Sequence, residues 1–334
     1  MSLIDKERIK LISLQGMISS ELKRFSATYD TLLTGETSYI DEICKYVKNG
    51  KSKQFRPTLL LVAAKSDQNT SDEVITAAAC VEMIHTATLL HDDFIDESDT
   101  RRGQPSVNAE YGNAVALIMG DYLYSKALDT LGSNEMFEPL ALLSKTTMLM
   151  SKAEMLQQET RDDLSIPEEK YLEIIDCKTG SLIESACTIG AGFNKELSKH
   201  KDAFGTFGLN LGRVFQITDD LFDYLGDPRR LGKPTGLDWS EGRITLPFIY
   251  AFNNADSQSK DNLLAEYQEC KAGTLDSMWP EVKSFVDQFG GIDYARSLAA
   301  KFGDDAKNAI CDVAGGRQRE LLDVSVEYVL NRLK

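Results

Sequence analysis

The sequence predicts an all-α protein. Apolar residues recur at three- and four-residue spacing from about Ile4 to Leu33 and again from Ile40 to Val47, which is the period of an amphipathic helix. No segment shows the clear alternation of apolar and polar residues that is typical of a half-buried strand. Most of the eight prolines fall where a periodic segment begins or ends. Because no composition shift or low-complexity linker divides the chain, we expect a single helical domain over residues 1–334.

Charge and composition limit the classes of function. Hydrophobic residues make up 42% of the 334 residues, which is enough for a sizeable core. The 52 acidic residues outnumber the 37 basic ones, and a net charge of -15 argues against nucleic acid or an anionic membrane surface as the main partner. No apolar run approaches a membrane span, and the N-terminus lacks the basic start of a signal peptide. We therefore expect a cytoplasmic protein without stable membrane insertion.

The six cysteines and three histidines narrow the chemistry further. The cysteines form no C-x-x-C pair and mostly lie in apolar segments, so we interpret them as reduced core thiols of a cytosolic protein. Three histidines without a C-x-x-C pair argue against a zinc site.

The expected helices follow one another with little between them. A helix starting near Pro57 comes after the first two periodic segments, and residues 71–98 form a long segment with Ser71 or Asp72 available as its cap. Further helical patterns cover residues 105–131, 139–158, 167–192 and 195–225. Met148, Met150 and Met155 are expected to fill an irregular apolar interior. Residues 261–334 show further amphipathic helical patterns without a chemical motif, so we expect them to pack against the rest of the protein.

Two aspartate clusters dominate the sequence. Asp92-Asp93-x-x-Asp96 and Asp219-Asp220-x-x-Asp223 are both D-D-x-x-D motifs inside apolar runs. On a helix the first and last aspartate of each motif lie one turn apart on the same face, where like charges repel. Each motif is also expected near a helix C-terminus, where the helix dipole disfavours negative charge. Such clusters reduce stability unless a multivalent cation binds them.

Basic residues occur near both motifs. Lys53 and Arg56 precede the helix that starts near Pro57. This basic segment is either an anion-binding site at the helix N-terminus or a solvated loop. His85 shares a helix face with Asp92 and Asp96, although a lone histidine is often just a core or surface residue. Arg101 and Arg102 follow the first motif, and paired arginines suit bidentate phosphate binding. They could instead neutralise the aspartates at the helix end.

The later part of the chain supplies more polar groups. Lys178 and Thr179 lie within a mostly apolar helical segment, so Lys178 either meets an anion or extends to solvent. Gln216 shares a face with Asp219 and Asp223, and the loop after the second motif carries Lys233.

Together these residues predict a metal-diphosphate site. Two carboxylate ladders supply only oxygen ligands, which favour Mg²⁺ that also binds substrate phosphates. The basic residues suffice for a second polyanion, and the space between the helices is apolar. A substrate with a diphosphate head and a hydrocarbon tail satisfies all of these features. Because no nucleophile–base pair is evident, departure of diphosphate into a dry, charge-stabilised pocket is the reaction we expect.

The motifs resemble those of the trans-isoprenyl (polyprenyl) diphosphate synthases, in particular the long-chain, octaprenyl-type branch. The likeness runs from about Lys51 to Arg243 and includes both D-D-x-x-D motifs with K-x-x-R, I-H-T, R-R-G, K-T and G-K-P-x-G in that order. The resemblance implies the isoprenoid-synthase fold, a single large helical bundle around a central cavity, and a homodimer. It implies elongation of an allylic diphosphate (farnesyl or geranylgeranyl diphosphate) with isopentenyl diphosphate by ionisation, condensation and elimination, using roughly three Mg²⁺ ions with substrate bound.

The resemblance also assigns roles to residues. By position, contacts to isopentenyl diphosphate fall on Lys53, Arg56, His85 and Arg102. Contacts to the allylic diphosphate fall on Arg101, Lys178, Thr179, Gln216 and Lys233. The direct Mg²⁺ ligands match Asp92, Asp96 and Asp219, with Asp93, Asp220 and Asp223 in support. The family's G-G-K-R-x-R-P is altered here around Lys53 and Arg56, Arg243 stands where lysine is common, and Ala153 stands where glycine is common.

Product length depends on the residues just before the first motif. In the family, bulky residues four and five positions before the first aspartate block the growing tail, and here these are the small Thr88 and Ala87. Each helical turn without an aromatic leaves the tunnel open by roughly 5.4 Å. We therefore predict a long product, roughly C30 to C50 by analogy. A floor is expected deeper, at Met119, Leu123, Leu128 and Leu131.

Other functions stay open. A short-chain synthase making farnesyl or geranylgeranyl diphosphate would share every motif except the chain-length residues. A terpene cyclase shares the fold but usually has a different second motif, and a non-catalytic subunit of a heteromeric synthase typically loses the aspartates. A Ca²⁺-binding helical scaffold would need the EF-hand loop spacing, which is absent.

Overall fold

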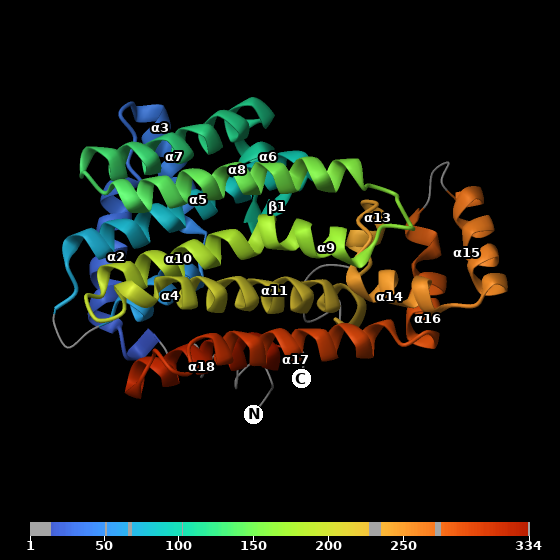
Figure 1. Ribbon diagram of the computed structural model, residues 1–334. Coiled ribbons are helices and arrows are strands. Elements are labelled where there is room, and N and C mark those ends of the chain that lie inside the picture. Colours follow the sequence, from blue (N-terminus) through green and yellow to red (C-terminus); the bar gives the residue numbers. More distant parts are fainter. Residues whose placement is uncertain are drawn as a thin grey trace.

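The computed structural model describes residues 15–50, 52–65, 69–101, 103–226, 235–270 and 275–332. Within these ranges the regular structure is helical apart from one short hairpin, which confirms the predicted all-α class (Figure 1). The start of the first periodic segment, Arg102 and Lys233 lie outside the described residues.

The helices follow the predicted order closely. They are α2 (Ser19–Leu32), α3 (Ser38–Asn49), α4 (Phe55–Ala64), α5 (Asp72–Ile95), α6 (Val107–Tyr111), α7 (Asn113–Ser133), α8 (Phe137–Glu159), α9 (Glu168–Ile175), α10 (Ser181–Phe193), α11 (Lys201–Leu225), α13 (Leu237–Ser240), α14 (Leu246–Asn254), α15 (Ser257–Cys270), α16 (Trp279–Gln288), α17 (Gly291–Ala309) and α18 (Gly316–Asn331). Short 3₁₀ turns cover Ser198–His200 and Leu275–Met278. A π-helix, Asp176–Gly180, joins α9 to α10.

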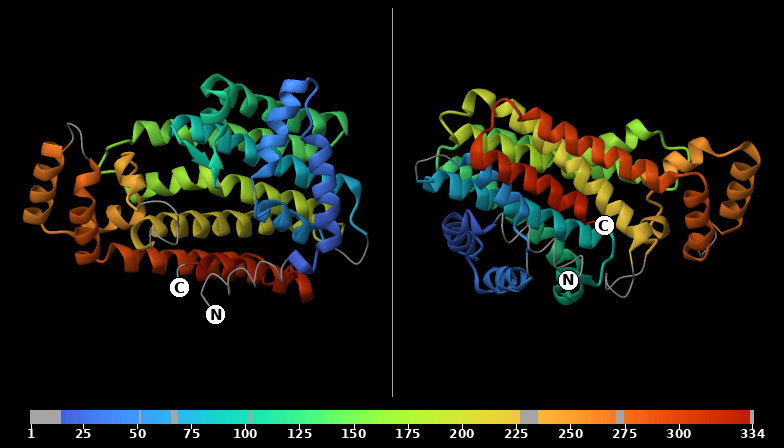
Figure 2. Two further views of the ribbon diagram at one scale, coloured as in Figure 1. Left: turned by 180° about the vertical axis from the view of Figure 1, so that it is seen from behind. Right: turned by 90° about the horizontal axis from the view of Figure 1, so that it is seen from below.

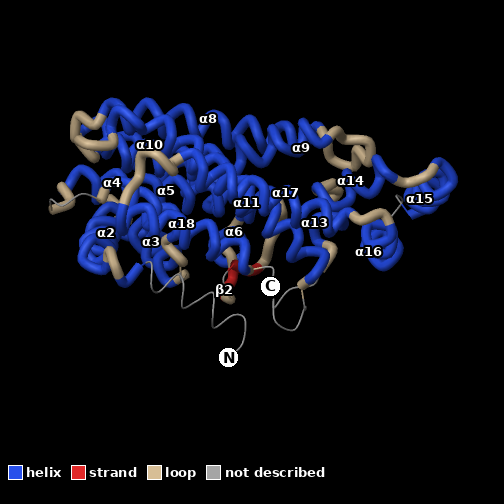
Figure 3. The backbone as a smooth tube through the Cα atoms, turned by 60° about the horizontal axis from the view of Figure 1, so that its bottom comes forward, coloured by secondary structure: helices blue, strands red, loops and turns tan. Residues whose placement is uncertain are grey.

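The long helices run alongside one another and share a buried core. Helix α10 packs against α4 and α11, α5 packs against α7, and α11 also packs against α17. The short helices α13 to α16 gather at one end of the bundle (Figures 1 and 3). The two views in Figure 2 show α2 and α3 flanking the opposite part of the bundle. The aspartate motifs therefore lie on long interior helices rather than on surface loops.

Helix α5 is apolar on nearly every side because it is enclosed by other helices. By length and hydropathy it could cross a membrane, contrary to the expectation that no apolar run approaches a membrane span. Most of that stretch is buried inside the bundle, and a core helix of this kind passes the same test. The finding is therefore weak support for a membrane span.

Close contact between α11 and the preceding helical segment depends on glycine. A Cβ atom on Gly212 would lie 2.5 Å from the Cα atom of Gly180, and one on Gly208 would lie 2.7 Å from the carbonyl oxygen of Ile183. Side chains there would force the two helices apart. This contact sets how near the second aspartate motif lies to Lys178 and Thr179.

Local details differ from the sequence expectations. Gly112 adopts a φ of 92° and divides the predicted 105–131 helix into α6 and α7. Residues Thr100–Arg101 (β1) and Gln104–Pro105 (β2) form an antiparallel hairpin with Thr100 opposite Pro105, too short to produce a strand pattern. Ser71 is the N-cap of α5 but makes no capping side-chain bond.

The methionine prediction for α8 was partly wrong. Met150 is buried, but Met148 and Met155 are 62% and 72% exposed. The bundle does not enclose these two side chains, and Leu117 and Ile118 of the neighbouring helix α7 are exposed as well. All six cysteines are free thiols; Cys44, Cys80, Cys177 and Cys187 are buried as predicted, but Cys270 is only partly buried and Cys311 is exposed.

Candidate active site

The first aspartate motif lies at the C-terminal end of α5, as predicted. Asp92 is in the last turn and Asp96 is the C-cap residue, and both line a cavity of about 240 Å³ (the carboxylate cavity). Burial raises the pKa of Asp92 to about 6. The charge of Lys178 lowers this pKa, whereas the carboxylates of Glu154 and Asp96 raise it further. Because the Asp92 carboxylate is costly to ionise in this position, a cation bound beside it would stabilise its charged form.

Asp93 points away from the other two aspartates of its motif. Its side chain is buried and accepts a hydrogen bond from Nε of Arg101 at 2.7 Å, and Nη2 of Arg101 also contacts it. The hairpin β1–β2 brings Arg101 back to α5. Arg101 in turn lines the carboxylate cavity with Asp92 and Asp96. Asp93 thus orients an arginine that lines the carboxylate cavity, but does not line that cavity itself.

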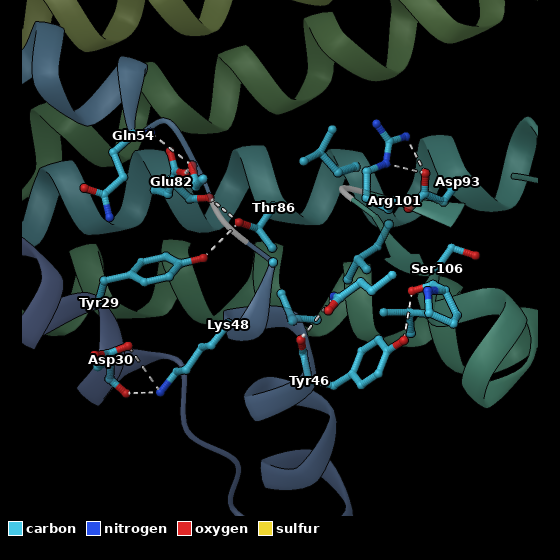
Figure 4. Close-up of a pocket in the computed structure, with 18 of the residues that line it drawn as sticks. Tyr29, Asp30, Tyr46, Lys48, Gln54, Glu82, Thr86, Asp93, Arg101 and Ser106 are labelled. Carbon is cyan, nitrogen blue, oxygen red and sulfur yellow. Dashed lines mark hydrogen bonds and ion pairs between the residues drawn. The ribbon is translucent and has the colours of Figure 1, made fainter. Parts of the chain in front are cut away.

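The same pair borders a second hollow. A cavity of about 500 Å³ lies between α2, α3, α5 and the hairpin, and Tyr29, Tyr46, Glu82 and Asp93 are among its lining residues (Figure 4). It occupies the face of α5 next to the one that carries Asp92 and Asp96. The Tyr29 hydroxyl and Thr86 are 2.9 Å apart across it.

The second motif on α11 divides its three aspartates among different tasks. Asp219 lines an apolar cavity, and Asp220 lines the carboxylate cavity. Asp223 is buried and accepts backbone N–H bonds from Leu237 and Asp238 at 3.1 Å each, so it caps α13. Gln216 and Asp219 border the same apolar cavity, as their spacing on one helix face predicted, whereas Asp223 is used by α13 instead.

Asp220 is held by two neutral donors. The Tyr171 hydroxyl donates at 2.6 Å and Nε2 of Gln216 donates at 2.8 Å. Burial, together with the nearby charge of Asp238, raises the pKa of Asp220 to about 8. Because Gln216 also accepts a bond from the Thr179 hydroxyl at 2.6 Å, the four polar groups form a connected chain from Thr179 through Gln216 and Asp220 to Tyr171.

Lys178 lies on the π-helix between the two motifs. Its ammonium contacts Oε1 of Glu154 and Oε1 of Gln157, each at 2.8 Å. Burial lowers the pKa of Lys178, but the carboxylates of Asp92 and Glu154 outweigh it and the net shift is upward. The lysine is therefore charged and faces an anionic environment, not solvent. π-helical turns of this kind occur frequently at functional sites.

The predicted basic pocket is present. Lys53, Arg56 and His85 line a cavity of about 240 Å³ (the basic cavity) with Phe215, Tyr328 and Arg332. Nη1 of Arg56 lies 3.1 Å from Nε2 of His85. Gln54, the N-cap of α4, has a positive φ of 51°, which turns the altered loop so that Lys53 and Arg56 border one cavity.

A fourth, more apolar cavity of about 540 Å³ connects the groups of the carboxylate and basic cavities (the apolar cavity). Its lining includes Thr88, Leu117, Tyr124, Met150 and Met155 together with Asp92, Lys178, Gln216 and Asp219. Thr88 borders it as the chain-length prediction required. Ala87 is fully buried and is absent from its lining, as are Met119, Leu123, Leu128 and Leu131.

Arg332 is a site residue that the sequence did not indicate. Nη2 of Arg332 lies 2.7 Å from Oδ1 of Asp219, and the guanidinium stacks on Phe215 and Phe222 at 5.0 Å from each ring centre. Its only sequence signal was an arginine in an amphipathic C-terminal segment. Glu154, Gln157, Tyr171 and Asp238 were likewise missed, because each acts through a contact between helices far apart in the chain.

The donor set fits magnesium completed by substrate phosphates. Among the described residues no cluster of three or more His, Cys, Asp or Glu forms a ready-made ligand cage. Asp92 and Asp96 present carboxylates to one cavity, whereas Oδ1 of Asp219 is buried beside Nη2 of Arg332 at 2.7 Å, so a metal at Asp219 would share that carboxylate with the arginine. Mg²⁺ in substrate complexes commonly takes only one or two carboxylates plus phosphate oxygens and water.

Comparisons with known proteins agree with this geometry. The family model for polyprenyl synthetase matches residues 37–279. The octaprenyl diphosphate synthase of Escherichia coli (strain K12) is 31% identical over 305 residues, which is 90% of this chain and 93% of that protein. A decaprenyl diphosphate synthase structure from Rhodobacter capsulatus has a TM-score of 0.89 at 28% identity and covers 97% of this chain and 99% of that one. A Caulobacter crescentus CB15 polyprenyl synthase complexed with calcium and isoprenyl diphosphate has a TM-score of 0.88 at 28% identity, covering 97% and 98%.

Proposed function

This chain belongs to the polyprenyl synthetase family and is a prenyltransferase, and we propose that it condenses isopentenyl diphosphate with an allylic diphosphate to give a long all-trans product. The observation that carries the proposal is the meeting of three cavities around α5 and α11. The basic cavity and the apolar cavity share Arg56, His85 and Phe215, while Lys178 and Gln216 border both the apolar and the carboxylate cavities. A diphosphate head, a second diphosphate and a hydrocarbon tail can thus be held together.

The basic cavity is the proposed site for isopentenyl diphosphate. Lys53, Arg56 and His85 supply three donors for its diphosphate, and the Arg56 guanidinium is held beside Phe215, 5.9 Å from the ring centre. An arginine fixed in this way offers paired N–H groups that match phosphate oxygens. Arg102, outside the described residues, is proposed as a fourth contact. The carbon chain of this substrate would then extend toward the apolar cavity.

The allylic diphosphate is proposed to lie between the two aspartate motifs. Arg101, Lys178, Thr179 and Gln216 border that space, with Lys233 proposed from outside the described residues. Asp92, Asp96 and Asp219 are the proposed Mg²⁺ ligands. Magnesium bound there would neutralise the departing diphosphate and assist cleavage of the allylic carbon–oxygen bond.

The chain's own residues govern the rest of the reaction. The apolar lining around Thr88, Leu117 and Tyr124 excludes water from the allylic cation, which then reacts with the double bond of isopentenyl diphosphate. Loss of a proton from the adduct regenerates an allylic diphosphate one isoprene unit longer. Because Thr88 leaves the cavity open beside α5, the tail can lengthen through several rounds, which supports a long-chain product over farnesyl or geranylgeranyl diphosphate.

A homodimer is part of the proposal. Leu117 and Ile118 on α7 are 41% and 65% exposed, and Met148 and Met155 on α8 are also exposed. Isolated exposed apolar residues are ordinary, but these lie on two helices that pack against each other. A second copy that covers α7 and α8 would bury them. We propose a cytoplasmic enzyme of this kind.

Incubation of the purified protein with Mg²⁺, farnesyl diphosphate and labelled isopentenyl diphosphate tests the proposal. Mass analysis of the extracted products should show a ladder ending at one long all-trans diphosphate. A product that stops at C20 would keep the chemistry and overturn the chain-length proposal. Release of diphosphate with a cyclic hydrocarbon, and no isopentenyl incorporation, would favour a terpene cyclase. Complete inertness would favour a subunit that needs a different partner.

A further inference from the structure

Two side chains of α8 hold the ammonium group of Lys178. Glu154 and Gln157, the α8 pair, are three residues apart, so they project from the same side of the helix. Each presents its Oε1 atom to Nζ of Lys178 at 2.8 Å. Both contacts are of hydrogen-bond length, and one joins opposite charges. The sequence position of neither residue indicated a link with Lys178.

The backbone beneath Lys178 is also held in place. Asp176, at the start of the π-helix, accepts bonds from Nε and Nη2 of Arg213 at 2.6 and 2.7 Å. The guanidinium of Arg213 stacks over Phe302 at 4.8 Å from the ring centre. This bidentate pair attaches the π-helix to α11. The backbone at the start of the π-helix is thus fixed to α11, and the α8 pair holds the Lys178 side chain that projects from it.

A donor count shows what the α8 pair leaves available. An ammonium group carries three N–H donors, and the α8 pair takes two of them. Lys178 makes no further hydrogen bond to a described residue that would use the third. The side chain borders both the carboxylate cavity and the apolar cavity. One N–H is thus left for a ligand at the junction of these cavities.

The α8 pair also prevents a competing contact. The charge of Asp92 is close enough to raise the pKa of Lys178, and a lysine side chain has four rotatable methylene groups with which to approach it. A direct Lys178–Asp92 ion pair would occupy the aspartate that the proposed Mg²⁺ needs. By holding the ammonium on α8, Glu154 and Gln157 keep both groups available.

We propose that Glu154 and Gln157 are positioning residues for the prenyl transfer, acting through Lys178 to present one N–H to the departing allylic diphosphate. The proposal rests on the proposed function, since it takes the ligand at this junction to be that diphosphate. It assigns α8 a role in the reaction beyond lining the apolar cavity. Neither residue contacts substrate in this scheme, so their effect must disappear when Lys178 is absent.

A double-mutant cycle tests this dependence. Glu154→Ala and Gln157→Ala should each lower kcat by about 10- to 100-fold, because a misplaced catalytic group costs that much. The KM for isopentenyl diphosphate should stay within about twofold, since the basic cavity is untouched. In the Lys178→Ala background the same substitutions should cause no further loss. Glu154→Gln, which keeps an acceptor oxygen, should lose less than Glu154→Ala.

Glu173→Gln provides the matched control. It removes a carboxylate that pairs with Lys152 of α8 at 2.7 Å, but this contact lies at the surface and borders no cavity described here. Its kcat should stay near that of the wild type. Thermal unfolding of every variant shows whether a loss of activity reflects unfolding, and Gln157→Ala, which removes no charge, is the milder of the two changes.

Two results would overturn the inference. One is a wild-type kcat in folded Glu154→Ala and Gln157→Ala, and the other is a loss that multiplies with that of Lys178→Ala. Failure of the proposed function looks different, because the wild-type protein itself would then fail to incorporate isopentenyl diphosphate.

Discussion

Nη1 of Arg243 lies 3.1 Å from Oδ1 of Asp96, joining two residues 147 positions apart in the chain. Nε of the same arginine bonds to Asp238 at 3.0 Å, and Nη2 contacts Glu241. Burial lowers the pKa of Arg243, but these three carboxylates outweigh it and raise it overall. A single guanidinium thus holds the C-terminal end of α5 against the segment that follows α13, on the wall of the carboxylate cavity.

Removal of that guanidinium should destabilise the protein. In Arg243→Ala the three carboxylates lose their shared counter-ion, and because the group is largely but not fully buried we expect a loss of about 1 to 3 kcal/mol in the free energy of unfolding. Urea unfolding measures it. Arg243→Lys should fall between wild type and Arg243→Ala, since lysine keeps the charge but cannot contact all three carboxylates as the guanidinium does. Equal stability of wild type and Arg243→Ala would contradict this account of the ion-pair cluster.

The metal-free protein should lose stability as the pH rises through the range set by Asp220. Its folded-state pKa of about 8 exceeds the ordinary value of 3.8, so the folded protein retains a proton that the unfolded chain releases. Between about pH 4 and pH 8 this group makes the free energy of unfolding fall with pH, by at most about 1.4 kcal/mol per unit.

Asp220→Asn isolates this effect, because asparagine keeps an oxygen that can accept the Tyr171 bond but cannot ionise. Thermal unfolding without Mg²⁺ at pH 5 and pH 8 should show the variant gaining stability relative to wild type at the higher pH. A difference between the two proteins that does not change with pH would rule out a raised pKa at this position.

Thr88 rather than Ala87 should control product length. Thr88 borders the apolar cavity, so Thr88→Phe should shorten the product while the protein still folds. Ala87 is fully buried, so Ala87→Phe adds volume to a packed core and should cost about 1 to 3 kcal/mol. Product mass and thermal unfolding distinguish the two variants. Unchanged product length in Thr88→Phe would show that the tail grows along a different path.

Gly212 should tolerate no side chain. A Cβ atom there would meet the Cα atom of Gly180 at 2.5 Å, so Gly212→Ala should push α11 away from the π-helix and lower stability by about 1 to 3 kcal/mol. Gly192→Ala on α10 is the control, because no atom lies within 4 Å of its added Cβ and alanine favours a helix by about 0.5 to 1 kcal/mol. Urea unfolding should place the two variants on opposite sides of wild type.

Much of the architecture could be predicted because its signals are local. Helical periodicity located the long helices, and the four-residue spacing placed Asp92 and Asp96 together at the end of α5. Residue types alone indicated an oxygen-ligand metal site beside a basic pocket. These inferences need only neighbours in the sequence, for which helix geometry supplies the distances.

The remaining features depend on contacts between distant segments. Helix spacing placed Asp223 on a face with Gln216 and Asp219, yet its carboxylate caps α13 because two backbone N–H groups there need an acceptor. Arg332 and Glu154 looked ordinary in the sequence, since only folding brings them to Asp219 and Lys178. Met148 and Met155 were misplaced because a nearly uniform helix gives no sign of which side is enclosed.

By itself the sequence determined the helical class, the two aspartate motifs and the kind of ligand they suit, since these follow from residue types and their spacing along one helix. Tertiary structure decided which aspartates border the cavities and which partner each of them has, as with Asp96 beside Arg243 and Asp223 under α13. It also decided that Thr88 and not Ala87 borders the cavity, and that α8 holds Lys178. Which partner a buried polar group finds depends on the packing of helices far apart in sequence, and that packing is set by the whole core.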